Sequence, residues 1–358
     1  MKTKEKVSII IPVHNGEKVL RKTVYGILNQ SYKNIEVILV ENCSVDKSAM
    51  ICDELRKIDK RVFVLYSNQK GTSLARKKGV EFATGRYILF SDQDDVYISK
   101  YSIEKMYRAI LEDEVQICQF GYYKKMERLG LKRKIKCTDK NEIIIRKKLF
   151  QNEIQGVIGK PNSKFTVNVW PKIYNAEVLK NAVKEINIPL FYGEDEYLNI
   201  CAFFNENTKK VSVRNEAYYV WNAGIGFSSQ MKNVKILFDE YKYIKPLTVN
   251  CIYKYECCKE ALFQCHCETL YFYKAMITQM IELGIDLNAV KKEIIRLNEY
   301  QFVQEAKKYF KIEKHDYIWD ELEFMSSEYT EEEYYEWCYT HMPQRSIKKY
   351  VKKIVKRY

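Results

Sequence analysis

Three carboxylates within four residues form the part of this sequence that is best suited to chemistry. Asp92, Asp94 and Asp95 directly follow the apolar run Tyr87-Ile88-Leu89-Phe90. We expect this run to be a buried strand that carries the acids to the edge of a sheet where α/β domains bind ligands. Carboxylates this close repel one another, and a divalent cation with oxygen ligands, Mn²⁺ or Mg²⁺, removes the repulsion. The pattern therefore predicts a metal site with a phosphate beside it.

Another candidate loop, Pro12-Val13-His14-Asn15-Gly16-Glu17, lies between an expected strand and an expected helix. The first backbone N–H groups of a helix attract anions, so this loop is a candidate phosphate site. The alternative is a plain turn that links the two elements.

Two more loops carry polar side chains after expected strands. Glu41-Asn42-Cys43-Ser44-Val45-Asp46 places Asn42 where it can face a nucleotide base, although Ser44 or Asp46 also suits a helix N-cap. Gly71 precedes a helix that carries Arg76 one turn in. A guanidinium matches a base or a phosphate, and a solvated surface arginine is the alternative.

The segments that position these loops alternate between strand and helix patterns. Such alternation implies parallel strands with helical crossovers, and hence an α/β fold with a mostly parallel central sheet. We expect strands at 7–11, 35–40, 61–66, 86–90 and 115–121, and helices at 17–30, 44–58, 72–83 and 102–111. Residues 122–148 are basic and predict a loop or hairpin. Order resumes at 166–179, followed by a helix at 193–204 and a strand at 210–221.

The character of the sequence changes near residue 230. Beyond it glycine almost disappears and long helical patterns rich in tyrosine follow. We therefore expect a domain over 1–230, with halves at about 1–121 and 122–230, and a helical region over 231–358. Cys251, Cys258 and Cys265 recur every seven residues, which favours one helical seam of small side chains over a zinc site.

In this order, the four loops resemble the motifs of family 2 glycosyltransferases of the GT-A fold. Pro12-Val13-His14-Asn15 resembles the family's P-x-Y-N, and Glu41 to Asp46 its D-D-G-S-x-D turn. Gly71 with Ala75-Arg76 matches its glycine and alanine-arginine pair, and Asp92-Gln93-Asp94 matches its D-x-D metal motif. The resemblance covers residues 6–112 well and 165–229 more loosely.

The resemblance implies an inverting, metal-dependent transferase that uses a nucleotide-diphosphate sugar. The cation, Mn²⁺ or Mg²⁺, would be held chiefly by Asp94, with Asp92 near the ribose. The resemblance favours a UDP-sugar. Asn42 stands where the family has an acid, and it does not exclude this donor, because an amide can accept from uracil N3–H and donate to its carbonyl. The implied nucleotide-sugar-binding residues are Pro12, Val13, His14, Asn15, Glu17, Asn42, Gly71, Arg76, Asp92, Gln93 and Asp94.

In similar enzymes, a Gly-Glu-Asp triplet such as Gly193-Glu194-Asp195 opens a helix beneath the acceptor. The acceptor hydroxyl must lose a proton as it attacks, and a positioned carboxylate can take it. The resemblance makes Asp195 the catalytic base, with Glu194 as the alternative. Acids also favour the first turn of a helix for its dipole alone.

Two aromatic segments carry less specific signals. Val169-Trp170-Pro171-Lys172-Ile173-Tyr174 resembles the family's V-W-N-K-L-Y segment and is assigned mainly to packing. Trp221 replaces an arginine of the family and either stacks on a sugar ring or packs in the core.

The composition narrows the setting and the partners. No apolar run reaches the length of a membrane span and no signal sequence is apparent, so a cytoplasmic protein with reduced thiols is expected. The net charge of +13 favours an anionic partner, and no common nucleic-acid-binding motif is present. The stretch 345–358 has an apolar stripe with lysines around it, which predicts a helix that holds the protein on the anionic inner face of the plasma membrane. The alternative is packing on its own domain or on a second copy of the chain.

The expected reaction is sugar transfer to a hydroxyl of a glycan or lipid-linked glycan in the synthesis of a bacterial surface polysaccharide. A catalytically silent scaffold of a polysaccharide assembly complex is the alternative, because Asn42, Cys43 and Trp221 depart from the family pattern. A nucleotidyltransferase is a second alternative. It would need an N-terminal phosphate loop rich in glycine and lysine, and the segment from Pro12 to Glu17 does not resemble one.

Overall fold

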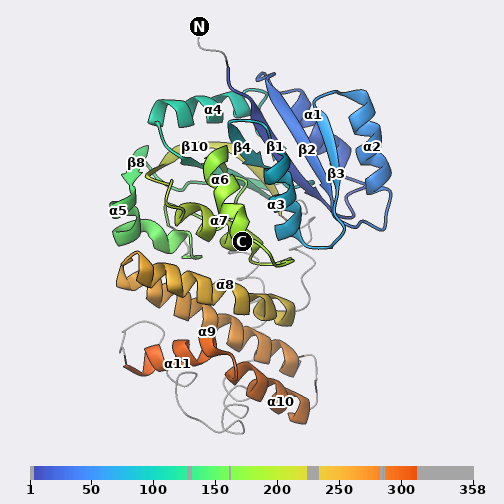
Figure 1. Cartoon of the computed structure of the whole chain (residues 1–358). Helices are drawn as coiled ribbons and strands as arrows, with labels where there is room; N and C mark the ends of the chain where they lie inside the picture. Colours follow the sequence, from blue (N-terminus) through green and yellow to red (C-terminus); the bar gives the residue numbers. More distant parts are fainter. Residues whose placement is uncertain are drawn as a thin grey trace. The chain divides into compact units, whose positions relative to one another are not determined.

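The computed structural model describes residues 4–126, 131–160, 163–223, 234–282, 285 and 287–312. The chain divides into two compact units, Met1–Gln230 and Met231–Tyr358. The first unit is a sheet flanked by helices and the second, where described, is helical (Figure 1). The predicted α/β class with a helical C-terminal region is therefore confirmed. The basic stretch 345–358 lies outside the described residues.

Ten strands of the described chain form a single sheet. Its order is β3-β2-β1-β4-β9-β6-β10-β5, with β7 beside β6 and β8 beside β10. Strands β3, β2, β1 and β4 are parallel, as are β6 and β10, whereas β9 runs antiparallel to both β4 and β6. The strands are β1 (Val7–Val13), β2 (Ile35–Glu41), β3 (Val62–Tyr66), β4 (Tyr87–Phe90), β5 (Val96–Tyr97), β6 (Ile117–Met126), β7 (Leu131–Ile135), β8 (Glu142–Ile145), β9 (Lys172–Asn175) and β10 (Lys210–Ala223).

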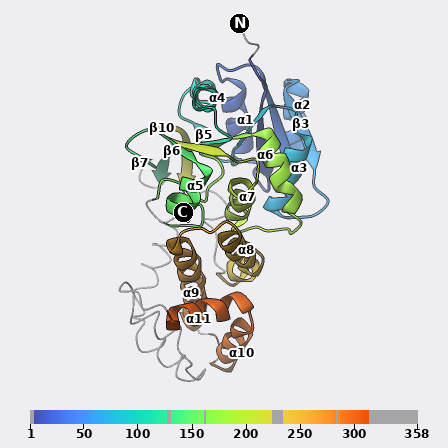
Figure 2. The ribbon, with the colours of Figure 1, turned by 60° about the vertical axis from the view of Figure 1, so that its left-hand side comes forward.

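Helices cover both faces of this sheet (Figure 2). Side chains alternate along a strand, so Ile9 and Ile11 of β1 pack in the core with α1, α2 and α4, while Ile10 faces α3. The helices are α1 (Leu20–Leu28), α2 (Ser48–Ile58), α3 (Thr72–Phe82), α4 (Ser102–Asp113), α5 (Arg146–Lys148), α6 (Ala176–Ala182) and α7 (Glu194–Phe203), with shorter turns at Leu149–Glu153, Ile154–Gly156 and Val183–Glu185.

Two helices begin later than the sequence predicts. Helix α1 begins at Leu20 rather than Glu17, and α2 begins at Ser48 rather than Ser44. Asp46 Oδ1 accepts the Ser48 N–H at 2.9 Å, which leaves Asp46 just outside the helix. Both corrections have one physical reason: the two loops bind each other through their backbone N–H groups instead of continuing the helices.

The second unit consists of α8 (Val234–Lys254), α9 (Lys259–Glu282), α10 (Leu287–Asn298) and α11 (Gln301–Ile312) over its described residues. Lys245 of α8 forms a buried ion pair with Glu268 of α9. Cys251 and Cys258 do not share one helical seam as predicted, because α8 ends at Lys254 and Glu256 adopts a left-handed backbone with φ 48°. No helix in the described part of the chain has the length and apolar content that crossing a membrane requires.

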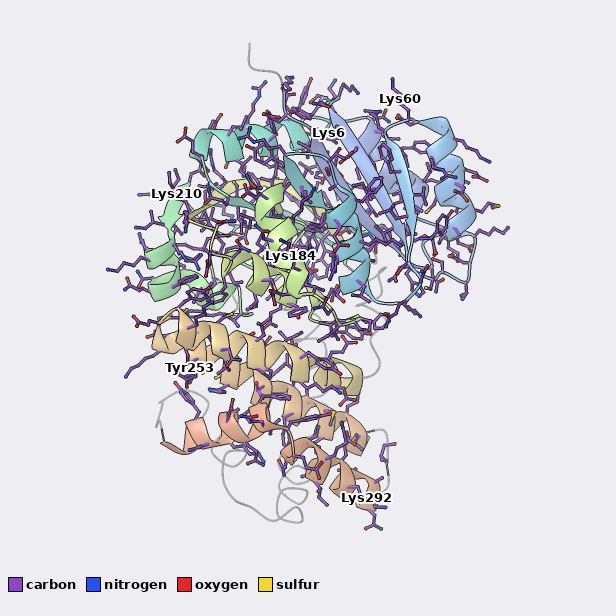
Figure 3. The ribbon with its side chains drawn as sticks, viewed as in Figure 1. Lys6, Lys60, Lys184, Lys210, Tyr253 and Lys292 are labelled. Carbon is purple, nitrogen blue, oxygen red and sulfur yellow. The ribbon has the colours of Figure 1, made fainter. Side chains whose placement is uncertain are left out.

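Basic side chains are spread over the surface of both units. Lys60, Lys210 and Lys292 are exposed and extend outward (Figure 3). These exposed basic side chains contribute to the net charge of +13.

His266 of α9 makes the second unit sensitive to acid. The imidazole is 4% exposed, and burial together with Lys245 lowers its pKa to about 4. In the unfolded chain, His266 binds a proton below the ordinary imidazole pKa of about 6.5, whereas in the folded chain it does so only below about pH 4. The free energy of unfolding therefore falls as the pH drops through this window. We expect the free energy of unfolding of the wild type to fall by up to about 3 kcal/mol across this window, and we expect His266→Gln to lack this fall. Urea unfolding of both proteins between pH 4 and 7 checks this, and parallel pH curves would contradict it.

Candidate active site

The candidate residues gather where parallel strands end. Strands β1, β2 and β4 finish at Val13, Glu41 and Phe90, so the loops that follow lie at the same edge of the sheet. Pro12 and Val13 themselves belong to β1, where they pair with Val40 and Glu41. Val13 is fully buried, so its side chain belongs to the core rather than to a binding surface.

The first loop uses its backbone N–H groups inside the protein. We expected these groups to face a bound anion, and that expectation is wrong, because a side chain of a neighbouring loop accepts from each of them. The bonds are His14 to Gln93 Oε1 (3.0 Å), Asn15 to Ser44 Oγ (3.1 Å), Gly16 to Ser48 Oγ (2.7 Å) and Glu17 to Asp46 Oδ2 (3.1 Å). Contact between this loop and a ligand therefore has to come from side chains.

His14 presents a neutral imidazole at this edge. Its Nδ1 lies 2.9 Å from the Asn42 carbonyl oxygen and its Nε2 lies 3.2 Å from Asn15 Nδ2. Burial and the charge of Lys70 lower the pKa of His14. Nδ1–H therefore donates to the carbonyl and Nε2 accepts from the amide, which fixes the ring.

Asn42 shapes the loops around it. The residue is 2% exposed, and its Oδ1 accepts the Gly71 N–H at 3.0 Å. The acceptor that we assigned to a nucleotide base thus already has a partner in the protein. Gly71 has φ +154°, and a Cβ there would lie 2.7 Å from Pro189 Cβ, so only glycine fits. Cys43, which stands in place of a glycine of the resembling motif, adopts a left-handed backbone with φ 57°.

Arg76 joins the two acidic motifs of the sequence. Its side chain is 3% exposed, so a solvated surface arginine is excluded. Nη1 donates to Glu194 Oε1 at 2.9 Å and lies 2.8 Å from Asp195 Oδ1, while Nη2 donates to Asp92 Oδ1 at 3.3 Å. The guanidinium binds carboxylates of α7 and of the loop after β4, rather than presenting a free face to a base or a phosphate.

The charges of this cluster do not balance. One guanidinium faces the carboxylates of Asp92, Glu194 and Asp195. Burial raises the pKa of Glu194 to about 8 and also raises the pKa of Asp92, while Arg76 opposes both shifts. A cation at this edge of the sheet would offset the repulsion between these acids and favour their ionised forms.

Asp94 is the residue best placed to bind that cation. Its carboxylate forms no ion pair with the described residues, and burial raises its pKa. The described residues contain no group of three or more His, Cys, Asp or Glu side chains that could hold a metal ion. Magnesium and manganese are often bound by one or two carboxylates plus phosphate oxygens. Asp94 with Asp92 fits that pattern if a ligand supplies the remaining oxygens.

Strand β10 holds the acidic turn in place, a role that the sequence did not predict. Tyr219 Oη accepts the Asp92 N–H at 2.9 Å. Asn222 donates its N–H to Asp95 Oδ1 at 2.8 Å and its Nδ2 to the Asp94 carbonyl at 2.6 Å. Asp95 is fully buried and its Oδ2 has no hydrogen-bond partner among the described residues. The run Tyr218-Tyr219-Val220-Trp221-Asn222 was the available signal for these contacts.

Gln93 also acts within the protein rather than on a donor. Its amide clamps the backbone of His14, accepting from N–H at 3.0 Å and donating to the carbonyl at 2.8 Å. A Cβ at Gly16 would lie 2.3 Å from Gln93 Oε1, so glycine is needed for this clamp. Gln93 therefore ties the loop after β1 to the acidic turn.

Trp221 is half-buried and contacts two neighbouring side chains. Its ring stacks on Trp170, with 6.3 Å between the ring centres and 28° between the ring planes. Lys124 Nζ lies 4.5 Å from the centre of the Trp221 ring. The packing alternative for Trp221 therefore accounts for it better than sugar stacking.

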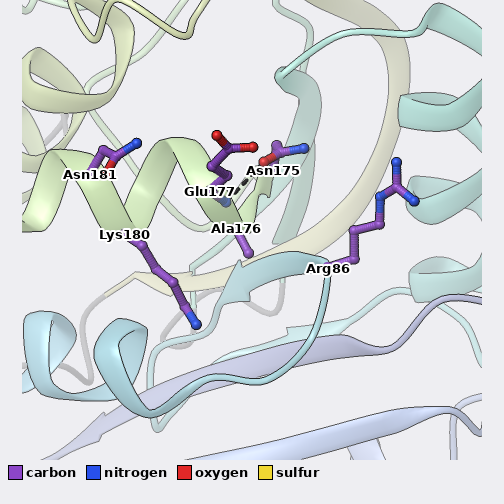
Figure 4. Close-up of a pocket in the computed structure, with 6 residues that line it drawn as sticks. All are labelled: Arg86, Asn175, Ala176, Glu177, Lys180 and Asn181. Atoms are coloured by element: carbon purple, nitrogen blue, oxygen red, sulfur yellow. Dashed lines mark hydrogen bonds between the residues drawn. The ribbon is translucent and has the colours of Figure 1, made fainter.

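A shallow hollow lies at the opposite end of β4. It involves Arg86, which precedes that strand, whereas Asp92 follows it, so the hollow is separate from the acidic cluster (Figure 4). Asn175 Oδ1 accepts the Glu177 N–H there at 2.9 Å, which caps α6. Its lining residues are Arg86, Asn175, Ala176, Glu177, Lys180 and Asn181.

Comparisons with known proteins agree with this architecture. Residues 8–167 match the family model described as Glycosyl transferase family 2. Glycosyltransferase GlyA of Streptococcus pneumoniae is 30% identical over 231 residues, which is 63% of this chain and 32% of that protein. The uncharacterized glycosyltransferase EpsJ of Bacillus subtilis is 27% identical over 225 residues, or 60% of each chain. The chain thus spans between about a third and three fifths of these relatives.

Among solved structures, S. aureus TarS 1–349 has the same fold. It has a TM-score of 0.59 and 20% identity, and the match covers 85% of this chain and 82% of that one. TarS 1–349 in complex with UDP-GlcNAc has a TM-score of 0.60 at the same identity, covering 85% and 81%. Residues 8–167 are thus similar to glycosyl transferase family 2, and the chain shares the fold of these solved structures.

Proposed function

We propose that the first unit transfers a sugar, with inversion, from a UDP-sugar to a hydroxyl of a glycan or lipid-linked glycan in bacterial surface-polysaccharide synthesis. Relatives of the chain are named glycosyltransferases, and TarS was crystallised with UDP-GlcNAc and with UDP. These matches support the class of donor, and the acceptor follows from the family resemblance.

The observation that carries this proposal is the position of Arg76 between the two acidic motifs. The guanidinium contacts Asp92, beside the expected donor phosphates, and Asp195, beneath the expected acceptor. A transferase needs these two groups close together, because the acceptor oxygen attacks as the diphosphate leaves. A fold that served only as a binding module would not need this convergence.

Each group then has a defined task. Asp195 takes the proton of the acceptor hydroxyl, whose oxygen forms a bond to the anomeric carbon from the face opposite the diphosphate. The bond from that carbon to the diphosphate oxygen breaks, and its electron pair leaves with UDP. The Asp195 carboxylate stays oriented because Val169 N–H donates to its Oδ2 at 3.2 Å. Mn²⁺ or Mg²⁺ at Asp94, with Asp92 nearby, would neutralise charge on the departing diphosphate.

A screen of sugar nucleotides tests the donor. Each candidate is added with Mn²⁺ or with Mg²⁺, and the shift in melting temperature and the slow release of UDP are measured. At a hundredfold excess over Kd, a bound donor adds about 2.7 kcal/mol to the stability of the folded state. We expect UDP-sugars to stabilise the protein only with a cation, and Asp94→Asn to abolish the effect. Equal stabilisation in EDTA would contradict the metal assignment.

One observation favours the alternative of a silent scaffold. Both oxygens of Asp195 already contact protein groups, Arg76 Nη1 and the Val169 N–H. Each carboxylate oxygen has a second lone pair, so a proton can still be accepted. Donor binding without any metal-dependent release of UDP would support the scaffold.

We also propose that the protein works in the cytoplasm, peripheral on the inner face of the plasma membrane. The basic stretch 345–358 would bind the anionic leaflet, and pairing with a second copy through the C-terminal region is the competing use. Sedimentation with anionic vesicles, with and without this stretch, separates the two.

A further inference from the structure

Segment 164–169 is irregular, partly buried backbone that leads to the candidate base. Phe165 and Val169 are fully buried, so the polar groups of this segment cannot rely on solvent. Besides Asp195 and Tyr174, whose hydroxyl donates to the Val169 carbonyl at 3.5 Å, three fully buried side chains from three different elements bind the backbone of the segment. They are Lys172 of β9, Gln119 of β6 and Asn199 of α7.

Lys172 makes two of these contacts. Its ammonium donates to the carbonyl of Thr166 at 2.7 Å and also to the carbonyl of Asn168. An ammonium has three donors and no acceptor, so a single lysine can bind two carbonyls that point to the same place. Lys172 therefore fixes the direction of two peptide groups just before Val169.

Gln119 and Asn199 hold the same segment from other sides. Gln119 Oε1 accepts the Thr166 N–H at 3.0 Å, and Asn199 Nδ2 donates to the Val167 carbonyl. Asn199 is held in turn by the Tyr174 hydroxyl, which donates to its Oδ1 at 2.9 Å. The segment thus has a specific partner at each of these groups, and its conformation is set by side chains rather than by a strand or a helix.

The last residue of the segment contacts the candidate base. Val169 donates its N–H to Asp195 Oδ2 at 3.2 Å, on the oxygen opposite the one that faces Arg76. Burial lowers the pKa of Lys172, and the negative charge of Asp195 opposes that shift.

We propose that Lys172 is a positioning residue for Asp195: by fixing segment 164–169 it holds the Val169 N–H on the carboxylate and so orients the base toward the acceptor hydroxyl. This inference rests on the proposed sugar transfer. Within the described residues, the hydrogen bonds of the Lys172 ammonium go to segment 164–169 and not to the loops after β1, β2 and β4. Its loss should therefore change turnover while leaving the affinity for the donor unchanged.

The experiment compares three variants of the full chain with the wild type. Lys172→Met keeps the length of the side chain but removes its donors and charge. Asn199→Leu removes the hydrogen bond that Asn199 Nδ2 donates to the Val167 carbonyl. Lys245→Met, in the second unit, is the matched control for the loss of a buried lysine. We measure UDP affinity by calorimetry, kcat for UDP release with the best donor, and amide hydrogen exchange of residues 163–171.

For Lys172→Met we expect kcat to fall 10- to 100-fold, UDP affinity to stay within twofold, and segment 164–169 to exchange at least tenfold faster. Asn199→Leu should show the same signature, and Lys245→Met should not. Unchanged exchange, unchanged kcat, or a loss of UDP affinity equal to the loss of kcat would overturn the inference. If Lys172→Met does not fold, Asn199→Leu alone decides by the same measurements. If the wild-type protein binds UDP but releases none from any donor, the proposed function itself is refuted. UDP binding and release by the wild type are therefore measured before any variant.

Discussion

Replacing Arg76 with methionine is expected to lower sugar transfer at least a thousandfold and to reduce the free energy of unfolding by about 3–5 kcal/mol. Arg76 is 3% exposed and faces three carboxylates, so the variant leaves buried acids without their cation. Those acids would then take up protons or move apart. Either response removes the contact that orients Asp195, and the base is lost together with the stability.

A matched variant separates this effect from the loss of any buried arginine. Arg214 binds Asp113 with two hydrogen bonds, at 2.8 and 2.5 Å, and is 13% exposed, but it lies away from the acidic cluster. Arg214→Met should also destabilise the fold while leaving kcat within a few-fold of the wild type. Urea unfolding and UDP release measured on both proteins decide the matter. Equal losses of kcat in the two variants would mean that Arg76 has only a structural role.

The sequence predicted strands β1 to β4 well because each is short, apolar and followed by a polar loop. Such runs have few ways to be buried other than as neighbouring parallel strands. Asp92, Asn42 and the loop at Pro12 were therefore placed at one edge of the sheet correctly. Helix starts were placed less well, because Ser48 and Asp46 bind the neighbouring loop, which a local pattern does not show.

The partners inside the site could not be predicted. Arg76 and Glu194 are 118 residues apart, and no spacing rule links them. Asn42 and Gln93 looked like ligand-binding side chains, yet they bind the backbone of Gly71 and His14. A polar side chain at a strand end has the same appearance in sequence whether it binds a ligand or a neighbouring loop. Only the fold distinguishes the two.

Lys172 is a residue whose polar role the sequence analysis missed. Within Val169 to Tyr174 it was assigned to packing, because it sits among aromatic and apolar residues. Its ammonium is in fact fully buried against two carbonyls of an irregular segment. A lysine inside an apolar run was the available signal, since a buried lysine needs partners to offset its desolvation.

Asp195→Asn is expected to reduce transfer by about a hundredfold to ten-thousandfold while leaving UDP affinity within twofold of the wild type. The amide has nearly the same shape as the carboxylate, but it cannot take the acceptor proton. It also has one acceptor oxygen instead of two, so it can keep the contact with Val169 N–H or with Arg76 Nη1, but not both. Single-turnover transfer and UDP calorimetry on the same preparation measure the two quantities separately.

Glu194→Gln is the matched control because Glu194 is the neighbouring acid on the same helix turn and binds the same guanidinium. Burial raises the pKa of Glu194 to about 8, so this carboxyl tends to hold a proton at neutral pH and is a poor base there. Its amide should therefore retain most of the activity that Asp195→Asn loses. If the two variants exchange these outcomes, Glu194 is the base and Asp195 only orients Arg76. If both retain activity, the proton leaves by another route and the cluster around Arg76 serves the fold alone.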